Sequence, residues 1–129
     1  MFLLDTDVLI WILRGKKEFV EKISSLKDTS PLSISVISIA EIYKNIFPSE
    51  LTVTEDFLNQ HIIFDVDQKI AKSAGLYWQQ FAKQFKNFSL TDCLIAATAN
   101  IHMATLVSLN TKHFPMKDIK LINPIAGVK

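Results

Sequence analysis

Residues 2–13 read FLLDTDVLIWIL: a short apolar run, two acids separated by Thr, and a longer apolar run. The first run has the length of a buried strand, and residues 8–13 continue as a helix that ends before Gly15. A strand that leads directly into a helix is typical of a parallel sheet, whose strands are joined by crossover helices. The stretch therefore predicts an α/β fold, with Asp5 and Asp7 at the carboxyl end of its first strand.

The rest of the chain repeats this alternation of short apolar strands and amphipathic helices. The expected strands are residues 31–36, 62–66, 106–109 and 121–122, and the expected helices are residues 16–28, 39–47, 52–60, 67–85 and 90–103. We therefore expect a single α/β domain over residues 1–129, in which a short parallel central sheet is flanked by helices.

Composition narrows the class of protein further. With 49% apolar and 21% charged residues, the 129-residue chain fits a folded domain rather than a disordered one. Its net charge of +1 creates no global field for a polyanion, so nucleic-acid binding requires a local patch or bound cations. Cys93 is the single cysteine, and no apolar run approaches the roughly 20 residues of a membrane span. We therefore expect a cytoplasmic protein without membrane attachment.

Polar side chains follow the predicted strands at the points where these end. Asp5 and Asp7 follow the first strand, Glu41 lies in the first turn of the helix after the second strand, and Asp92 lies in the first turn of the Ala-rich helix. Asn110 directly follows the fourth strand. Because parallel strands end at one edge of the sheet, these groups should converge there. Converging carboxylates repel one another unless a cation neutralises them, and oxygen ligands favour Mg²⁺ or Mn²⁺.

Each of these acids also has a purely structural interpretation. Ser38 and Ser89 stand three residues before Glu41 and Asp92, which is the spacing of a helix capping box. Asp5 can likewise cap the helix that follows it. The coincidence of these acids at one predicted edge favours a metal site over separate caps.

Four segments then carry a resemblance to a known family. They are residues 3–10 (LLDTDVLI), 38–42 (SIAEI), 90–99 (LTDCLIAATA) and 106–110 (LVSLN), the last followed by His113 and Phe114. In this order and at this spacing they resemble the motif regions of PIN-domain ribonucleases, and most closely those of bacterial VapC-type toxins. The resemblance implies that Asp5, Glu41 and Asp92 bind metal and that these acids and Asn110 form the catalytic site.

The resemblance also implies an activity and partners. The activity is Mg²⁺- or Mn²⁺-dependent endonucleolytic cleavage of RNA phosphodiester bonds, leaving a 5′-phosphate. The protein would be the toxin of a type II toxin-antitoxin pair, so its partners are an RNA substrate and a cognate antitoxin protein. We also expect a homodimer.

Three further residues have supporting positions in this resemblance. Thr6 and Ser108 match small hydroxyl positions that hold acids or water by hydrogen bonds. Asp7 stands where the family often has Asn, Ser or Thr. Its charge either compensates in part for the neutral Asn110, which the family often replaces by Asp, or faces solvent. With a neutral amide at position 110, a second metal site is in doubt.

Contacts to the RNA backbone are harder to assign, because exposed basic residues usually serve solubility. The candidates near the predicted edge are Arg14, Lys16, Lys17, Lys112 and His113. The helical settings of Trp11, Tyr77, Trp78 and Phe81 favour core or subunit contacts over base stacking. Cys93 lies in an apolar helix, which favours a buried hydrophobic side chain over a nucleophile.

Two other classes share parts of this pattern. Asp5-Thr6-Asp7-Val8 fits the first motif of haloacid-dehalogenase-type phosphatases, but no acidic pair follows the later strand. A receiver-like phospho-switch has a similar length and could use Asp65 as the phosphorylated residue. That alternative leaves Glu41 and Asp92 without a role.

Overall fold

The structure is a computed structural model, which describes residues 1–125. Residues 126–129, which belong to the expected domain, lie outside the described residues. Along the chain the elements are β1 (Phe2–Leu4), α1 (Thr6–Leu13), α2 (Lys17–Thr29), β2 (Leu32–Ser35), α3 (Val36–Tyr43), the 3₁₀ helix η1 (Pro48–Glu50), α4 (Leu51–Leu58), β3 (Ile62–Phe64), α5 (Gln68–Phe81), α6 (Leu90–Ile101), β4 (Thr105–Val107), the 3₁₀ helix η2 (Thr111–His113) and β5 (Lys120–Ile122). In this described part, no helix combines the length and apolar character needed to cross a membrane.

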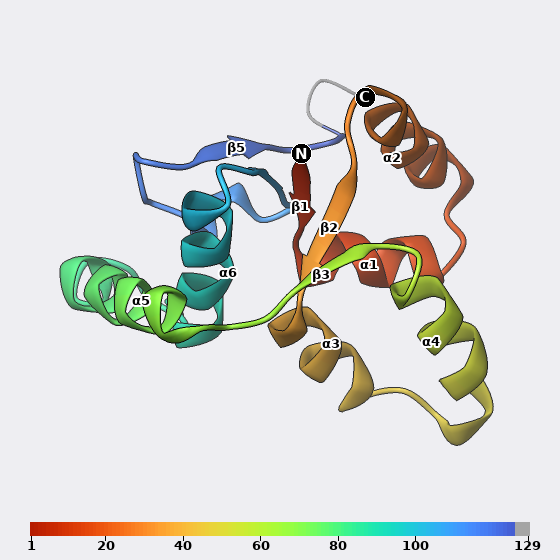
Figure 1. The fold of residues 1–129 in the computed structure, drawn as a ribbon, viewed down its shortest axis with the longest axis horizontal. Coiled ribbons are helices and arrows are strands. Elements are labelled where there is room, and N and C mark those ends of the chain that lie inside the picture. Colours follow the sequence, from red (N-terminus) through yellow and green to blue (C-terminus); the bar gives the residue numbers. More distant parts are fainter. Residues whose placement is uncertain (126–129) are drawn as a thin grey trace.

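The five strands form one parallel sheet in the order β3-β2-β1-β4-β5, with β1 at its centre (Figure 1). Leu3 of β1 lies in register with Ser33 of β2 on one side and with Leu106 of β4 on the other. The chain moves outward from β1 to β3 and then returns to place β4 on the opposite side of β1. The strand order therefore reverses beside β1, next to Asp5, where the functional crevice of such sheets lies. This topology confirms the predicted α/β class.

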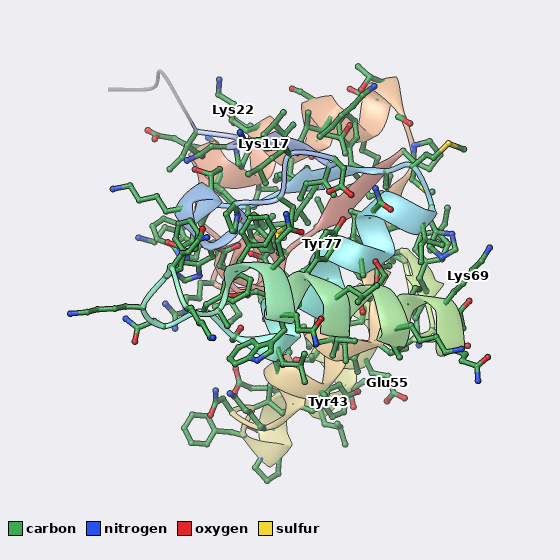
Figure 2. All side chains as sticks on the ribbon, turned by 90° about the vertical axis from the view of Figure 1, so that its left-hand side faces the viewer. Lys22, Tyr43, Glu55, Lys69, Tyr77 and Lys117 are labelled. Atoms are coloured by element: carbon green, nitrogen blue, oxygen red, sulfur yellow. The ribbon has the colours of Figure 1, made fainter. Side chains whose placement is uncertain are left out.

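Helices cover both faces of the sheet, because consecutive residues of a strand point to opposite faces. Leu3 belongs to a buried cluster with α5 and α6, which includes Tyr77 and Ile95. Leu4 belongs to a second buried cluster with α1 to α4, which includes Leu9. Figure 1 shows these two groups of helices on opposite sides of β1, and Figure 2 shows α5 crossing in front of α6. Two apolar layers thus hold the central strand, and with it the acids at its carboxyl end.

The start of α3 corrects one prediction. The helix begins at Val36 and its N-cap is Ser35, whose Oγ accepts a hydrogen bond from the backbone N–H of Ile37 at 3.1 Å. The capping box predicted for Ser38 and Glu41 is therefore wrong, and Glu41 does not lie in the first turn. Both serines fit a cap position, but Ser38 is fully buried inside the helix.

The end of α5 differs as well. A helix was predicted over residues 67–85, whereas α5 ends at Phe81 and a separate connection leads to α6. In this connection Asn87 has a φ of 60°, a left-handed conformation that Asn tolerates better than most residues. The chain turns there and brings Phe88 back towards α5.

Candidate active site

Asp5 lies at the centre of the site and is only 7% exposed. As N-cap of α1, it accepts a hydrogen bond from the backbone N–H of Thr6 at Oδ1, at 2.8 Å. Its Oδ2 accepts from the hydroxyl of Ser108, beyond β4, at 2.7 Å. Burial, followed by the nearby charge of Asp7, raises the pKa of Asp5 to about 7, although the bonds from Ser108 and Thr6 act in the opposite direction.

Glu41 reaches this centre from the second turn of α3. The hydroxyl of Thr6 donates a hydrogen bond to Oε1 of Glu41 at 2.7 Å. The same Oγ1 lies 2.9 Å from the Oγ of Ser38. Thr6 thus joins the start of α1 to α3. Sequence reasoning treated Ser38 only as a cap and missed this contact. Its signal was the spacing of three residues between Ser38 and Glu41, which places both on one helix face.

Asp92 enters from the first turn of α6, as predicted. Ser89 is the N-cap of this helix, and its Oγ accepts a hydrogen bond from the Asp92 backbone N–H at 3.0 Å. The side chain of Asp92 is 16% exposed, and its Oδ2 lies 3.6 Å from Nδ1 of His113. Burial raises the pKa of Asp92 most, the charge of Glu41 raises it further, and Ser89 and His113 oppose the shift. Asp92 also raises the pKa of Asp5, so the acids of β1, α3 and α6 share one field.

Asp7 and Asn110 form a pair at the rim of the site. Oδ2 of Asp7 accepts hydrogen bonds from Nδ2 of Asn110 at 3.0 Å and from the backbone N–H of Leu109 at 3.2 Å. Oδ1 of Asp7 is buried and has no hydrogen-bond partner among residues 1–125. Burial raises the pKa of Asp7, while the amides of Val8, Leu109 and Asn110 favour its charged form. The carboxylate of Asp7 is therefore partly buried and held by Asn110 and Leu109, rather than simply pointing into solvent at the start of α1.

Comparison with known proteins places this arrangement in a family. The PIN domain family model matches residues 2–119, which include every acid of the site. The chain belongs to the PIN domain family. It is 34% identical to Ribonuclease VapC10 of Mycobacterium tuberculosis over 116 residues, which cover 90% of this chain and 87% of that protein. It is 31% identical to Ribonuclease VapC2 of Haemophilus influenzae over 119 residues, covering 88% of this chain and 89% of that protein. Within the PIN domain family, the chain therefore belongs to the VapC ribonucleases, as the sequence resemblance predicted.

Chains of solved toxin-antitoxin complexes have a similar fold. A chain of a toxin-antitoxin complex from Klebsiella pneumoniae superposes with a TM-score of 0.77 and 26% identity, covering 96% of this chain and 98% of that chain. A chain of DNA-bound VapBC from Salmonella typhimurium gives a TM-score of 0.80 and 25% identity, covering 95% and 97%.

The five basic residues expected to contact RNA differ in their position relative to the acids of the site. His113 contacts Asp92, and Arg14 lines a hollow together with Glu41. Lys16 lies over the ring of Trp11, with 4.5 Å between Nζ and the ring centroid. The other two, Lys17 at the start of α2 and Lys112 in η2, are exposed. Of the five basic residues, His113 and Arg14 thus lie beside an acid of the site, His113 by its contact with Asp92 and Arg14 by lining the same hollow as Glu41.

The donor set of this PIN domain suits a hard divalent cation. Its groups are carboxylate, hydroxyl and amide oxygens, which Mg²⁺ and Mn²⁺ prefer. In residues 1–125 no three His, Cys, Asp or Glu side chains form a ready-made metal-binding group. Asp5 uses both oxygens, and Glu41 uses Oε1, in hydrogen bonds within the protein. The unpartnered Oδ1 of Asp7 and the raised pKa values of the three aspartates fit a centre that lacks positive charge.

Proposed function

We propose that this chain is an endoribonuclease that hydrolyses RNA phosphodiester bonds with Mg²⁺ or Mn²⁺, and that it is the toxin of a toxin-antitoxin pair. The observation that carries the proposal is the shared field of Asp5, Glu41 and Asp92 at the switch point of a PIN domain sheet. Buried acids that raise one another's pKa destabilise a fold, so a cation or a catalytic task is the usual reason for them. In this proposal the protein acts in the cytoplasm, where it meets its RNA substrate.

In this proposal Asp5, Glu41 and Asp92 hold the cation. When bound, a divalent cation stabilises charge on the phosphodiester and lowers the pKa of the attacking water. Thr6 fixes Glu41, and Ser108 fixes Asp5, through the hydrogen bonds described above. No protein nucleophile is required.

The residues that the alternative functions would use are poorly suited to those roles. Cys93 is fully buried, and burial raises the pKa of its thiol to about 11, so it is not a thiolate at neutral pH. Asp65, the residue that a receiver-like switch would phosphorylate, follows the edge strand β3 and is exposed. A dehalogenase-type phosphatase also requires an acidic pair after the later strand, where this chain has Asn110.

The first test is metal-dependent cleavage. The purified chain should cut single-stranded or structured RNA in Mg²⁺ or Mn²⁺, and EDTA should stop it. The Asp92→Asn variant should lose activity by at least about a hundredfold, because it loses a charge at nearly constant shape. The matched control is Asp65→Asn, which changes an exposed acid after another strand and should cut at the wild-type rate. Full activity in EDTA would overturn the proposal.

We propose a positioning role for Asn110 beside the catalytic one that the resemblance implies. Because its amide donates to Asp7, we assign it to positioning Asp7, which supplies the fourth carboxylate in place of residue 110. The resemblance places Asn, Ser or Thr at the position of Asp7 and Asp or Asn at that of Asn110, so in this proposal the acid of the pair stands at position 7 and the amide at position 110.

This pairing predicts a stability cycle. Asn110→Asp should destabilise the metal-free chain by about 1 kcal/mol, because a second negative charge replaces the donor to Asp7. Adding Asp7→Asn restores one acid and one amide and should recover most of that loss. Thermal unfolding in EDTA measures both variants, with Asn59→Asp, an exposed Asn of α4's C-terminal end, as control. An exchanged variant that is no more stable than Asn110→Asp alone would contradict the pairing.

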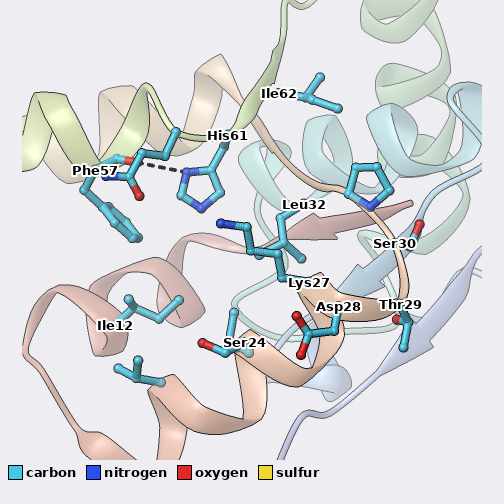
Figure 3. Close-up of a pocket in the computed structure, with 14 residues that line it drawn as sticks. Ile12, Ser24, Lys27, Asp28, Thr29, Ser30, Leu32, Phe57, His61 and Ile62 are labelled. Atoms are coloured by element: carbon cyan, nitrogen blue, oxygen red, sulfur yellow. Dashed lines mark hydrogen bonds between the residues drawn. The ribbon is translucent and has the colours of Figure 1, made fainter.

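The proposed antitoxin has a suitable groove. A cavity of about 680 Å³ lies between α2 and α4 over α1, with apolar residues such as Ile12, Val20 and Phe57 in its wall. Figure 3 shows Lys27 and His61 entering it from α2 and from the end of α4. A second hollow of about 510 Å³ is lined by Leu13 and Glu41. In this proposal an apolar antitoxin segment occupies the first cavity, whose lining contains none of the site acids, and a basic side chain in the second hollow, beside Glu41, would compete with the cation. The homodimer stays a prediction.

A further inference from the structure

Residues 68–91, which comprise α5 and the connection to α6, contain four Lys and no Asp or Glu. The rest of the chain holds all 13 acids and the other 10 of the 14 Lys and Arg. Lys69, Lys72, Lys83 and Lys86 are all exposed. Among residues 1–125, the one ion pair within 4 Å joins His113 and Asp92, so no acid neutralises these lysines at contact distance. We call these four lysines the basic strip.

Two exposed aromatic rings accompany the basic strip. Trp78 is 41% exposed and Phe85 is 40% exposed, whereas Phe88 between them is only 9% exposed. Trp78 stacks on Phe88 with 5.8 Å between ring centroids and 18° between ring planes, and Phe85 contacts Phe88 at 6.3 Å. Of the sequence-based expectation of core or subunit contacts, Tyr77, which is 7% exposed, meets the first, whereas Trp78 lies only partly in the core. A buried ring therefore fixes two rings that present area to solvent.

The basic strip ends at the active site. The connection terminates at Ser89, whose Oγ accepts from the backbone N–H of Asp92 at 3.0 Å. From Lys86 to Asp92 the chain can span at most about 20 Å, so the lysine lies within a few nucleotides of the acids. Lys86 is therefore within reach of the backbone of an RNA strand bound at Asp92.

From these observations we infer that the basic strip, Trp78 and Phe85 bind the single-stranded RNA substrate beside the acids. The inference rests on the proposed ribonuclease function. Lysines meet phosphates through sequence-independent charge, and exposed rings stack on unpaired bases, a combination typical of single-strand binding surfaces. Double-stranded RNA keeps its bases stacked and cannot use the rings. A second copy of the chain is the competing occupant of this face, and the sedimentation measurement below distinguishes it from RNA.

Binding of a fluorescent single-stranded RNA oligonucleotide tests the surface, with all variants made in the inactive Asp5→Asn chain. Lys83→Ala with Lys86→Ala should weaken binding about tenfold at moderate salt and reduce the slope of log affinity against log salt by about 1.4. Phe85→Ala should weaken binding about tenfold with an unchanged salt slope, since stacking involves no counterion release. Phe85→Leu, which keeps the apolar contact with Phe88 but not the ring, should behave like Phe85→Ala if stacking is the cause.

The control removes the same charge elsewhere. Lys22 and Lys27 are exposed residues of α2, which packs in the apolar layer opposite to that of α5, so Lys22→Ala with Lys27→Ala should bind within about twofold of the parent. Equal binding by the two double variants would overturn the surface, as would a dimer in sedimentation that Phe85→Ala dissociates. Cleavage by the wild-type chain distinguishes a failure of the proposed surface from a failure of the proposed ribonuclease function. If it cuts RNA, only the surface falls; if it neither binds nor cuts RNA, the proposed function falls too.

Discussion

Replacing Asp5 by Asn should abolish RNA cleavage and, in EDTA at pH 7.5, raise the melting temperature of the chain. Activity is lost because an amide cannot supply the negative charge that the proposed cation requires. Stability rises because Asp5 is 7% exposed and its burial raises its pKa to about 7. The isosteric Asn keeps an oxygen for Thr6 and an amide for Ser108 without a buried charge.

The direction of this stability change follows from the pKa of Asp5 in the unfolded and in the folded chain. The ordinary pKa of 3.8 applies to the unfolded chain, so between about pH 4 and 7 the folded chain binds the proton more tightly. The contribution of Asp5 to stability is therefore full below pH 4, falls as the pH rises to 7, and stays low above. A shift of this size corresponds to an order of 2–4 kcal/mol at neutral pH, or about 5–15 °C in melting temperature.

Melting curves of both proteins in EDTA at pH 4.5 and 7.5 measure this effect. The difference between Asp5→Asn and wild type should shrink to about a third or less at pH 4.5, where the folded chain already holds the proton. Adding Mg²⁺ at pH 7.5 should stabilise the wild type more than the variant. Asp65→Asn is the exposed control and should melt with the wild type. A difference that is absent, or equal at both pH values, would show that burial does not strain Asp5.

The sequence predicted this site where local signals and the sheet edge agree. Asp5 follows an unmistakable strand, and Asp92 follows the cap Ser89 in an Ala-rich helix, so both positions follow from short-range patterns. Glu41 was placed at the right edge through a wrong cap, because the β-branched residues before Ser38 read as a continuing strand. The observed cap, Ser35, is also a local signal, whereas the contact of Ser38 with Thr6, 32 residues away, could not be read from the local sequence.

Long-range pairs account for the rest of what sequence reasoning could not settle. Asn110 and Asp7 are 103 residues apart, so no local pattern shows that one amide holds the other's carboxylate. The acid-free run of residues 68–91 is visible in the sequence, but which of its side chains stay exposed depends on how α5 packs on α6. Residue types in the sequence therefore indicated the kind of site, whereas the hydrogen-bond partners of each side chain could be identified only from the fold.

Expression of this chain alone should arrest bacterial growth. The proposed activity cleaves RNA that the cell needs, so induction should stop growth while the inactive Asp5→Asn chain should not. Co-expression of the antitoxin from the neighbouring reading frame should restore growth. Growth curves with confirmed soluble, active protein measure all three cases. Harmless expression of active wild-type chain would contradict the toxin role and leave a nuclease of another cellular purpose.

The groove between α2 and α4 allows inhibition to be separated from toxicity. Ser24 lines this groove and is exposed, so Ser24→Trp fills the cavity without disturbing the core. Its neighbour Ser25 is also exposed but does not line the groove, and Ser25→Trp adds the same bulk beside it. Both variants keep the acids, so both should arrest growth. Only Ser24→Trp should escape rescue by the antitoxin, because the inserted segment and the indole compete for the same volume; equal rescue of both would place the antitoxin on another face.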